Sequence, residues 1–426
     1  MILGHAIALD PTDAQAAQFR RACGVARFAF NWGLAEWKRM HEAGEKPSAQ
    51  KIKARWNAVR KVEFPWSMEV TKCASGQSIL DLGTAFANFF RDLKKPKGGR
   101  KARFPRFKTK RNDNGFALWN DQFQIDGDRI RIPKVGWVRM REPLRFAGKI
   151  MGARVTKIGN RWHVSVQVEV TDCDLKSAPV STVGVDLGIT ALMTLSKPLP
   201  DGRIKIDNPR ARRSLIGRQR KIARRISRQE LQRRKTNAKT SRRQMVRRDR
   251  LKNLHYRIAS IRKDAMHKAT TAIANAFNVV VLEDLNVLGM AKNQRLSGAI
   301  LDASPGELRR QIEYKMAMRG GRVVIADRWF PSSKRCSASG CGHVVDKLPL
   351  SVREWVCPSC GTHHDRDENA AKNLELLVVG AACPEPAGND ATPTRGEMEA
   401  LASSQDDVKL PSMNREISQP THVARA

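Results

Sequence analysis

The sequence is short of several features, and each shortage excludes a class of protein. No run of 18 or more apolar residues occurs in the 426-residue chain, so we expect no membrane-spanning segment and no membrane partner. Eight cysteines are too few for a disulfide scaffold in a chain of this length. Residues 1–5 lack the positive charge of a secretory signal, and Asp10 interrupts the apolar segment that follows. These absences predict a cytoplasmic protein.

Acidic residues are also scarce relative to basic ones. The 42 Asp and Glu residues stand against 78 Lys and Arg residues, which leaves a formal net charge of +36. Residues 210–250 contain 18 Lys and Arg but only two acids, Glu230 and Asp249. A solvated charged face is the alternative interpretation, but a run of one sign repels itself unless an anion neutralises it. The charge therefore favours contact with nucleic acid and predicts association with the nucleoid.

The first half of the chain changes from a helical to an extended pattern. Thr12 and Gln15 form a capping-box signal, which predicts that a helix starts here. Helical material continues until residues 94–101, where proline, glycine and a charge run predict a loop or domain edge. Apolar residues then alternate with polar ones on either side of Gly159, which is typical of a β-hairpin. We therefore expect a small antiparallel sheet or barrel within residues 103–178.

The second half has the pattern of an α/β sheet. Residues 183–186, 279–282 and 322–325 are short runs rich in β-branched residues, and helical stretches separate them. Residues 381–426 mix Pro, Gly, Ser, Asp and Asn with little apolar periodicity, which predicts a disordered tail. At roughly 100–200 residues per domain, the whole chain should hold two to four domains.

Acidic residues stand where predicted buried strands end. Asp186 and Glu283 each close such a strand, and a further acid is expected from the helix that opens at residues 365–373. Each acid alone could be a turn or helix-cap residue, but buried carboxylates gathered together need a compensating cation. Such a group would hold a pair of Mg²⁺ or Mn²⁺ ions that hydrolyse a phosphodiester. Asp284 should point to the opposite face of the sheet from Glu283.

Four of the cysteines are clustered. Their spacing predicts a tetrahedral structural Zn²⁺ site in a reducing compartment. Four residues separate the first pair, where two are usual, so a nearby histidine could replace one of its ligands. The candidate ligands are Cys336, Cys341, Cys357 and Cys360, and the possible replacements are His343, His363 and His364.

An ordered series of motifs resembles a known family. The motifs are GVDLG at 184–188, VLEDL at 281–285, PSSKRC at 331–336, CPSCG at 357–361 and DRDENAAKN at 365–373. The series is similar to TnpB, the transposon-encoded RNA-guided nuclease, and GVARFAFNW at 24–32 is similar to the opening helix of that family. The resemblance covers about residues 1–380.

The resemblance implies a multidomain protein of α+β and α/β class. It would have an N-terminal β-barrel (wedge) with an inserted helical recognition domain, followed by an RNase H-like RuvC nuclease domain with an inserted zinc ribbon. The implied ranges are 1–10 and 103–178 for the barrel, 11–102 for the helical domain, 179–329 and 363–380 for the nuclease domain, and 330–362 for the ribbon.

The resemblance also assigns roles to individual residues. Asp186, Glu283 and Asp367 would be the catalytic ligands of Mg²⁺ or Mn²⁺. In the last motif the second aspartate matches the family, so Asp365 is the less favoured choice. The wide gap between Cys336 and Cys341 departs from the family pattern and affects the expected geometry of the zinc site alone.

By the same resemblance, a guide RNA from the transposon end pairs with one strand of a double-stranded DNA target. The protein would act as a monomer on its RNA and cut the target, in association with transposition. Two alternatives stay open: an RNA-guided repressor that binds without cutting, and a compact type V CRISPR effector. The repressor would require loss of the acidic triad, whereas Asp186, Glu283 and Asp367 are all present here.

Overall fold

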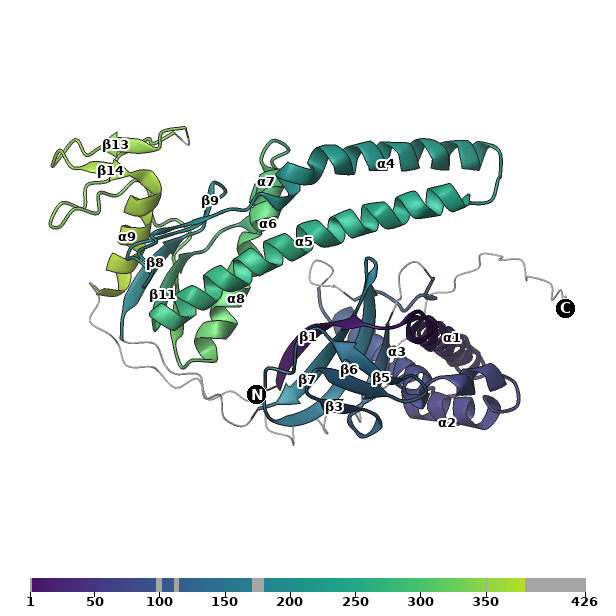
Figure 1. Cartoon of the computed structure of the whole chain (residues 1–426). Helices are drawn as coiled ribbons and strands as arrows, with labels where there is room; N and C mark the ends of the chain where they lie inside the picture. Colours follow the sequence, from purple (N-terminus) through teal and green to yellow (C-terminus); the bar gives the residue numbers. More distant parts are fainter. Residues whose placement is uncertain (1, 97–101, 111–114, 171–179, 350, 380–426) are drawn as a thin grey trace. The chain divides into compact units, whose positions relative to one another are not determined.

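The N-terminal region contains a seven-stranded antiparallel sheet (Figure 1). The computed structural model describes residues 2–96, 102–110, 115–170, 180–349 and 351–379, and the tail predicted at 381–426 lies outside them. The strand order is β2-β6-β7-β1-β5-β4-β3. The strands are β1 (Ile2–Asp10), β2 (Gly115–Trp119), β3 (Gln124–Asp126), β4 (Arg129–Ile132), β5 (Gly136–Met140), β6 (Lys149–Ile158) and β7 (Arg161–Glu169).

The predicted hairpin and antiparallel sheet are confirmed. Strands β6 and β7 pair antiparallel on either side of Gly159, which has a φ of +63°. Trp162 and the valines that alternate along β7 are buried, as period-two alternation requires. The first strand pairs with β7, Leu3 lying opposite Val168. The order of the sheet ends at β2 and β3, so closure into a barrel stays a prediction.

Three long helices lie between the first two strands of this sheet in the sequence. They are α1 (Asp13–Glu42), α2 (Ala49–Val59) and α3 (Lys72–Leu93), with short 3₁₀ helices at Pro65–Glu69 and Asn120–Gln122. The predicted capping box is present, because the Thr12 hydroxyl accepts the Gln15 N–H at 3.3 Å. Trp56 of α2 is fully buried beside Ile79 of α3 and Ala29 of α1, so aromatic and aliphatic side chains hold the helices together.

The second sheet is of mixed α/β type, as predicted. Its order is β10-β9-β8-β11-β12, in which β11 runs parallel to both of its neighbours, whereas β9 and β10 are antiparallel additions. The strands are β8 (Thr182–Asp186), β9 (Ala191–Leu195), β10 (Lys205–Asp207), β11 (Val279–Glu283) and β12 (Arg322–Ala326).

Helices cover both faces of this sheet. Val280 and Leu282 pack against α5 and α8 on one face, whereas Val281 packs against Leu374 of α9 on the other. Alternation along β11 therefore fills two cores at once. The helices are α4 (Ala211–Lys235), α5 (Arg242–Ala276), α6 (Val287–Ala291), α7 (Ser297–Ala303), α8 (Pro305–Ala317) and α9 (Arg366–Val379).

The cysteine-rich segment forms a small hairpin before α9. Strand β13 (Glu354–Val356) pairs antiparallel with β14 (His363–Asp365), and α9 begins at the next residue. The hairpin thus extends three residues beyond the ribbon boundary expected at residue 362. The ribbon and α9 are therefore continuous, so the position of one constrains the other.

Candidate functional site

The two predicted strand-end acids lie on neighbouring parallel strands. Leu282 of β11 is paired with Val185 of β8, so Asp186 and Glu283 follow at the same edge of the sheet. Carboxyl ends of parallel strands form the usual ligand-binding edge of an α/β sheet. Both residues keep part of their surface exposed there, although protein atoms surround most of the Asp186 carboxyl group.

A glycine lets α9 carry a third acid to this edge. A Cβ atom at Gly184 would lie 1.9 Å from the Ala371 carbonyl oxygen and 2.6 Å from the Glu375 nitrogen. The backbone of α9 therefore rests directly on β8, which no larger residue permits. Asp367 lies one helical turn before Ala371, toward the end of β8 that carries Asp186.

The electrostatics of Asp186 show that the three acids share one environment. Burial raises the pKa of Asp186 to about 8, with further contributions from the negative charges of Glu283 and Asp367. Arg366 and Arg353 oppose this shift, and Arg353 also pairs with Asp367 at 3.5 Å. A carboxyl group in this setting needs a positive partner in order to ionise at neutral pH, and a divalent cation would provide one.

Two neighbouring acids have other partners. Asp365 accepts the backbone N–H groups of Asp367 and Glu368 at 2.9 and 3.0 Å, so it caps the first turn of α9. Burial opposes its ionisation, but Lys205 and these N–H groups outweigh that effect and lower the pKa of Asp365. Asp284 pairs with Arg309 at 3.1 Å and with Arg328.

Three polar residues that the sequence reasoning did not single out support the site. The Ser332 hydroxyl donates to Glu283, and the Asn373 amide donates to the Ser332 carbonyl at 2.8 Å and to the Arg335 carbonyl at 2.6 Å. Asn369 also donates to Arg335, at 2.7 Å. Both asparagines are 1% exposed. The two asparagines are four positions apart in DRDENAAKN, which places them on one face of the helix. This spacing is the feature of the sequence that could have pointed to them.

The four clustered cysteines meet as predicted. All four sulfur ligand atoms lie within 4.8 Å of one another, and no other group of three or more His, Cys, Asp or Glu side chains among the described residues is packed this closely. Two of the Sγ···Sγ distances are 3.6 and 3.7 Å, whereas four sulfurs about 2.3 Å from a tetrahedral Zn²⁺ would be about 3.8 Å apart. The cysteines are therefore not disulfide-bonded and have the spacing of zinc ligands.

The histidines do not displace any of the four thiols. His364 Nε2 lies 3.0 Å from the Cys336 sulfur, so the imidazole contacts a cysteine of the cluster. The His364 ring also packs on Trp355, with the ring centroids 4.8 Å apart. His364 thus contacts the cysteine cluster without belonging to the group of four closely spaced sulfurs.

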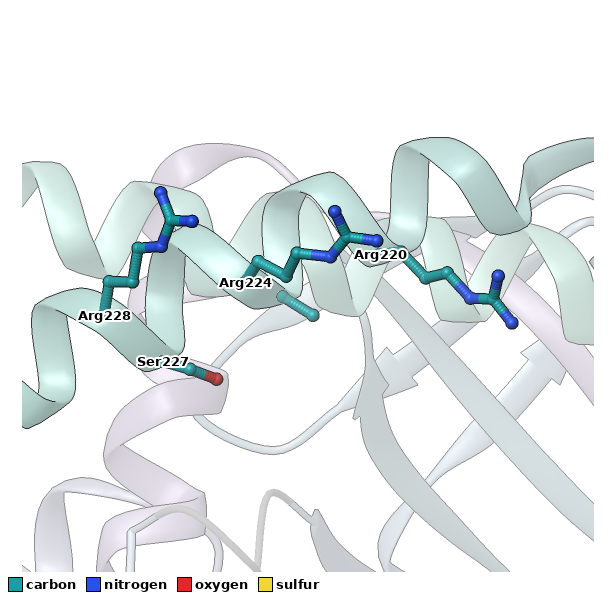
Figure 2. A pocket seen from close by; sticks show the side chains of 5 residues that line it. Arg220, Arg224, Ser227 and Arg228 are labelled. Carbon is teal, nitrogen blue, oxygen red and sulfur yellow. The ribbon is translucent and has the colours of Figure 1, made fainter.

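The basic segment forms a helical hairpin. Helices α4 and α5 lie side by side and antiparallel, as seen in Figure 1. Arg220, Arg224 and Arg228 follow one another along α4, as Figure 2 shows, and they line a shallow groove. A spacing of four residues corresponds to a rise of about 6 Å along the helix. Such a row of guanidinium groups suits an extended polyanion.

Among the described residues, no helix combines the length and apolar character needed to cross a bilayer. An acidic sheet edge, a four-cysteine ribbon and a cationic hairpin are together typical of proteins that process nucleic acid.

Comparisons with known proteins identify the family. Three family profiles match: "Helix-turn-helix domain" at residues 1–46, "Probable transposase" at 163–294 and "Cas12f1-like, TNB domain" at 306–374. A Streptomyces pristinaespiralis protein named "Putative RNA-guided DNA endonuclease" is 35% identical over 87% of this chain and 88% of its own length. InsQ of Escherichia coli K12, which carries the same description, is 32% identical over 88% of this chain and 91% of its own length. The chain belongs to the TnpB family.

A solved structure also aligns with most of the chain. The structure titled "Structure of the mini-RNA-guided endonuclease CRISPR-Cas_phi3" covers 91% of this chain and 94% of its own, with 10% sequence identity and a TM-score of 0.42.

Proposed function

We propose that this protein is an RNA-guided DNA endonuclease associated with a transposable element. The observation that carries the proposal is the electrostatic coupling of three acids at the edge of the second sheet, where the charges of Glu283 and Asp367 help burial to raise the pKa of Asp186. The family relationship supports guidance by RNA, and the chemistry of the carboxylates supports hydrolysis.

The three carboxylates would hold Mg²⁺ or Mn²⁺ between them. Oxygen ligands from acidic side chains suit these hard cations, and a bound pair would activate water and stabilise the leaving oxygen of a phosphodiester. In this proposal β8 and β11 would present Asp186 and Glu283 to the metals, and α9 would present Asp367. Ser332 orients Glu283 by donating its hydroxyl hydrogen to that carboxylate.

The basic hairpin would hold the nucleic acid that brings the target to this edge. Its arginines neutralise phosphates of a guide RNA from the transposon end or of the RNA–DNA duplex, without reading bases. The target is double-stranded DNA, and the protein acts as a monomer on its RNA in the cytoplasm, near the nucleoid. In this proposal the second sheet and its helices are the RuvC nuclease domain, and the first sheet is the wedge barrel.

The cysteine cluster would hold a structural Zn²⁺. Four thiolates complete a tetrahedral site and leave no position for a reacting water. The ion would rigidify the segment that leads from β12 through Ser332 to α9. Zinc would therefore support the nuclease site without taking part in the reaction.

The test is cutting of a plasmid that carries a target matched to the guide RNA. Asp186→Ala, Glu283→Ala and Asp367→Ala should each abolish linear product in Mg²⁺ while guided binding survives, because the acids act on the metals and not on base pairing. Chelator should abolish cutting by the native protein.

Asp365→Ser is the matched control, because serine keeps the helix cap but removes the carboxylate. It should retain cutting. Cutting by Asp186→Ala would overturn the nuclease proposal. Loss of cutting in Asp365→Ser together with activity in Asp367→Ala would show that the ligand is Asp365, and guided binding without cutting by the native protein would favour the repressor.

A further inference from the structure

A tryptophan beside the carboxylate edge is exposed to solvent. Trp329, between β12 and the cysteine ribbon, has 85% of its surface exposed, although tryptophan is highly buried on average in folded proteins. The five-residue strand β12 that precedes it is the parallel partner of β11, with Ala326 opposite Glu283. The indole therefore follows the strand end next to a proposed metal ligand.

The loop that presents Trp329 is anchored on its N-terminal side. The Trp329 N–H donates to the Asp327 carboxylate at 2.8 Å, and Arg328 pairs with Asp284. Asp284 is held in turn by Arg309 of α8. These contacts hold the residues that precede the indole, and the indole itself stays exposed to solvent.

The loop is equally anchored on its C-terminal side. Phe330 packs into the core formed by Val281 and Leu374, and Ser332 is bonded to Glu283 and Asn373. Ser332 lies three positions after Trp329, so their Cα atoms are at most about 11 Å apart. Trp329 is thus held at a short distance from Glu283 by a loop whose neighbouring side chains are bound to the protein.

An exposed indole on a fixed loop suits a flat apolar ligand. A nucleobase presents such a face, and stacking on an aromatic side chain tolerates any base. The site beside it would take a phosphodiester, and the chain has a net charge of +36, so the ligand that approaches this edge is nucleic acid. At 3.4 Å per stacked nucleotide, 11 Å corresponds to about three nucleotides.

We infer that Trp329 is a stacking platform for an unpaired base of the DNA strand that enters the carboxylate site. The inference rests on the proposed function for the identity of that strand. Stacking would hold the strand within about three nucleotides of the bond to be cut. A duplex hides its base faces, so the indole would favour single-stranded DNA over paired DNA at this edge.

The experiment uses the full chain with its co-purified RNA and short single-stranded DNA probes that each carry one 2-aminopurine. Chelator prevents cutting, and raised salt weakens binding through phosphates alone. Trp329→Ala should bind the probes about tenfold more weakly than the native protein, the loss expected for one stacked base, and should lose the fluorescence quenching at one probe position. Trp329→Phe should retain most of both signals.

Leu288→Ala is the matched control, because Leu288 is 83% exposed on α6, just after β11, but has no aromatic ring. It should bind as the native protein does. Native binding by Trp329→Ala, or equal losses in Trp329→Ala and Leu288→Ala, would overturn the inference, and the second result would indicate that apolar contact in general, and not ring stacking, supports DNA binding at this edge. Thermal unfolding confirms that each variant is folded.

Plasmid cutting by the native protein, measured in parallel, separates this inference from the proposed function. If the native protein fails to cut but shows the Trp329-dependent quenching, the nuclease proposal fails and the stacking site stands. If the native protein cuts and the quenching is absent from every probe position, the stacking site fails alone.

Discussion

At the scale of the residue, the site depends on the absence of a Cβ atom at Gly184. Gly184 lets α9 approach β8, and through that contact Asp367 reaches the environment of Asp186. A methyl group 1.9 Å from a backbone oxygen cannot be accommodated by a change of rotamer, because backbone atoms belong to the helix itself. A residue with no functional group therefore determines where a charged one lies.

Gly184→Ala should lower the free energy of unfolding by about 3 kcal/mol, at the upper end of the usual cost of overpacking. It should also reduce plasmid cutting, because α9 must move away from the sheet. The midpoint of urea-induced unfolding and the cutting assay measure the two effects. Gly217→Ala is the control: it lies in α4 with open space around it and should gain up to about 1 kcal/mol from helix propensity. Equal midpoints for the two variants would contradict the packing argument.

At the scale of the element, the ribbon and α9 behave as one piece. The four sulfurs, His364 and the two asparagines of α9 lie in a continuous set of contacts that runs from Cys336 to Ser332. Since Ser332 is bonded to Glu283, the ribbon also reaches the acidic edge. Loss of the proposed zinc should therefore also loosen the structure beyond the ribbon.

Cys357→Ser should release about one zinc per chain and increase amide hydrogen exchange in residues 332–365, because three thiolates no longer complete the site. Cys336→Ser should lose less, because His364 Nε2 already lies 3.0 Å from that sulfur. Elemental analysis and hydrogen exchange measure these effects. Cys73→Ser, which removes a buried thiol from α3, is the control and should keep any zinc. A native protein without zinc would refute the proposal.

The α4–α5 hairpin carries its own internal acid. Hydrogen bonding to Arg233 lowers the pKa of Glu230 to about 2, and Arg248 of α5 also pairs with this carboxylate. Because the folded-state pKa is below the ordinary value of 4.5, the contribution to stability is complete above about pH 4.5 and disappears as the pH falls toward 2. Glu230 thus joins the two helices at neutral pH.

Glu230→Gln should lower the thermal unfolding midpoint at neutral pH, and the difference from the native protein should shrink as the pH falls from 4.5 toward 2. Calorimetry across this range measures it. Asp249→Asn is the control, because Asp249 pairs with Lys252 at 3.6 Å on an exposed surface, where ion pairs contribute little. A constant difference at every pH would exclude the titration of Glu230 as the cause.

At the scale of the whole molecule, the charge requires a partner. The chain carries +36, and the arginine row on α4 lies open along a shallow groove (Figure 2). Neutralising each phosphate releases counterions, so affinity should fall steeply with salt. This dependence distinguishes a nucleic-acid surface from a merely solvated one.

Titration of the protein with its RNA at several salt concentrations should give a slope of log K against log salt of about −0.7 to −0.9 for each neutralised phosphate. Replacing Arg220, Arg224 and Arg228 together by Gln should make that slope less negative by about 2 to 3. Arg203→Gln is the control, because Arg203 is already paired with Asp201 at 2.9 Å. A nearly flat slope for the native protein would mean that the hairpin is a solvated face.

Local patterns in the sequence by themselves determined the individual strands, the helix cap and the cysteine cluster of this protein. Periodicity predicted the hairpin of β6 and β7 and the strands that end in Asp186 and Glu283, because alternation depends only on which side chains face a core. Covalent spacing predicted that the four cysteines would gather. The capping box could be predicted because Thr12 and Gln15 are only three positions apart in the sequence.

Only the tertiary structure decided how the pieces meet, because those contacts join residues that are distant in the sequence. It placed β1 beside β7, set α9 against Gly184 and bonded Ser332 to Glu283 across 49 positions. It also showed that Asp365 caps a helix. From the sequence, any acid at the end of a strand or helix could have had that role. The exposure of Trp329 has the same origin, since a pattern of apolar residues cannot show which of them a fold leaves without a core.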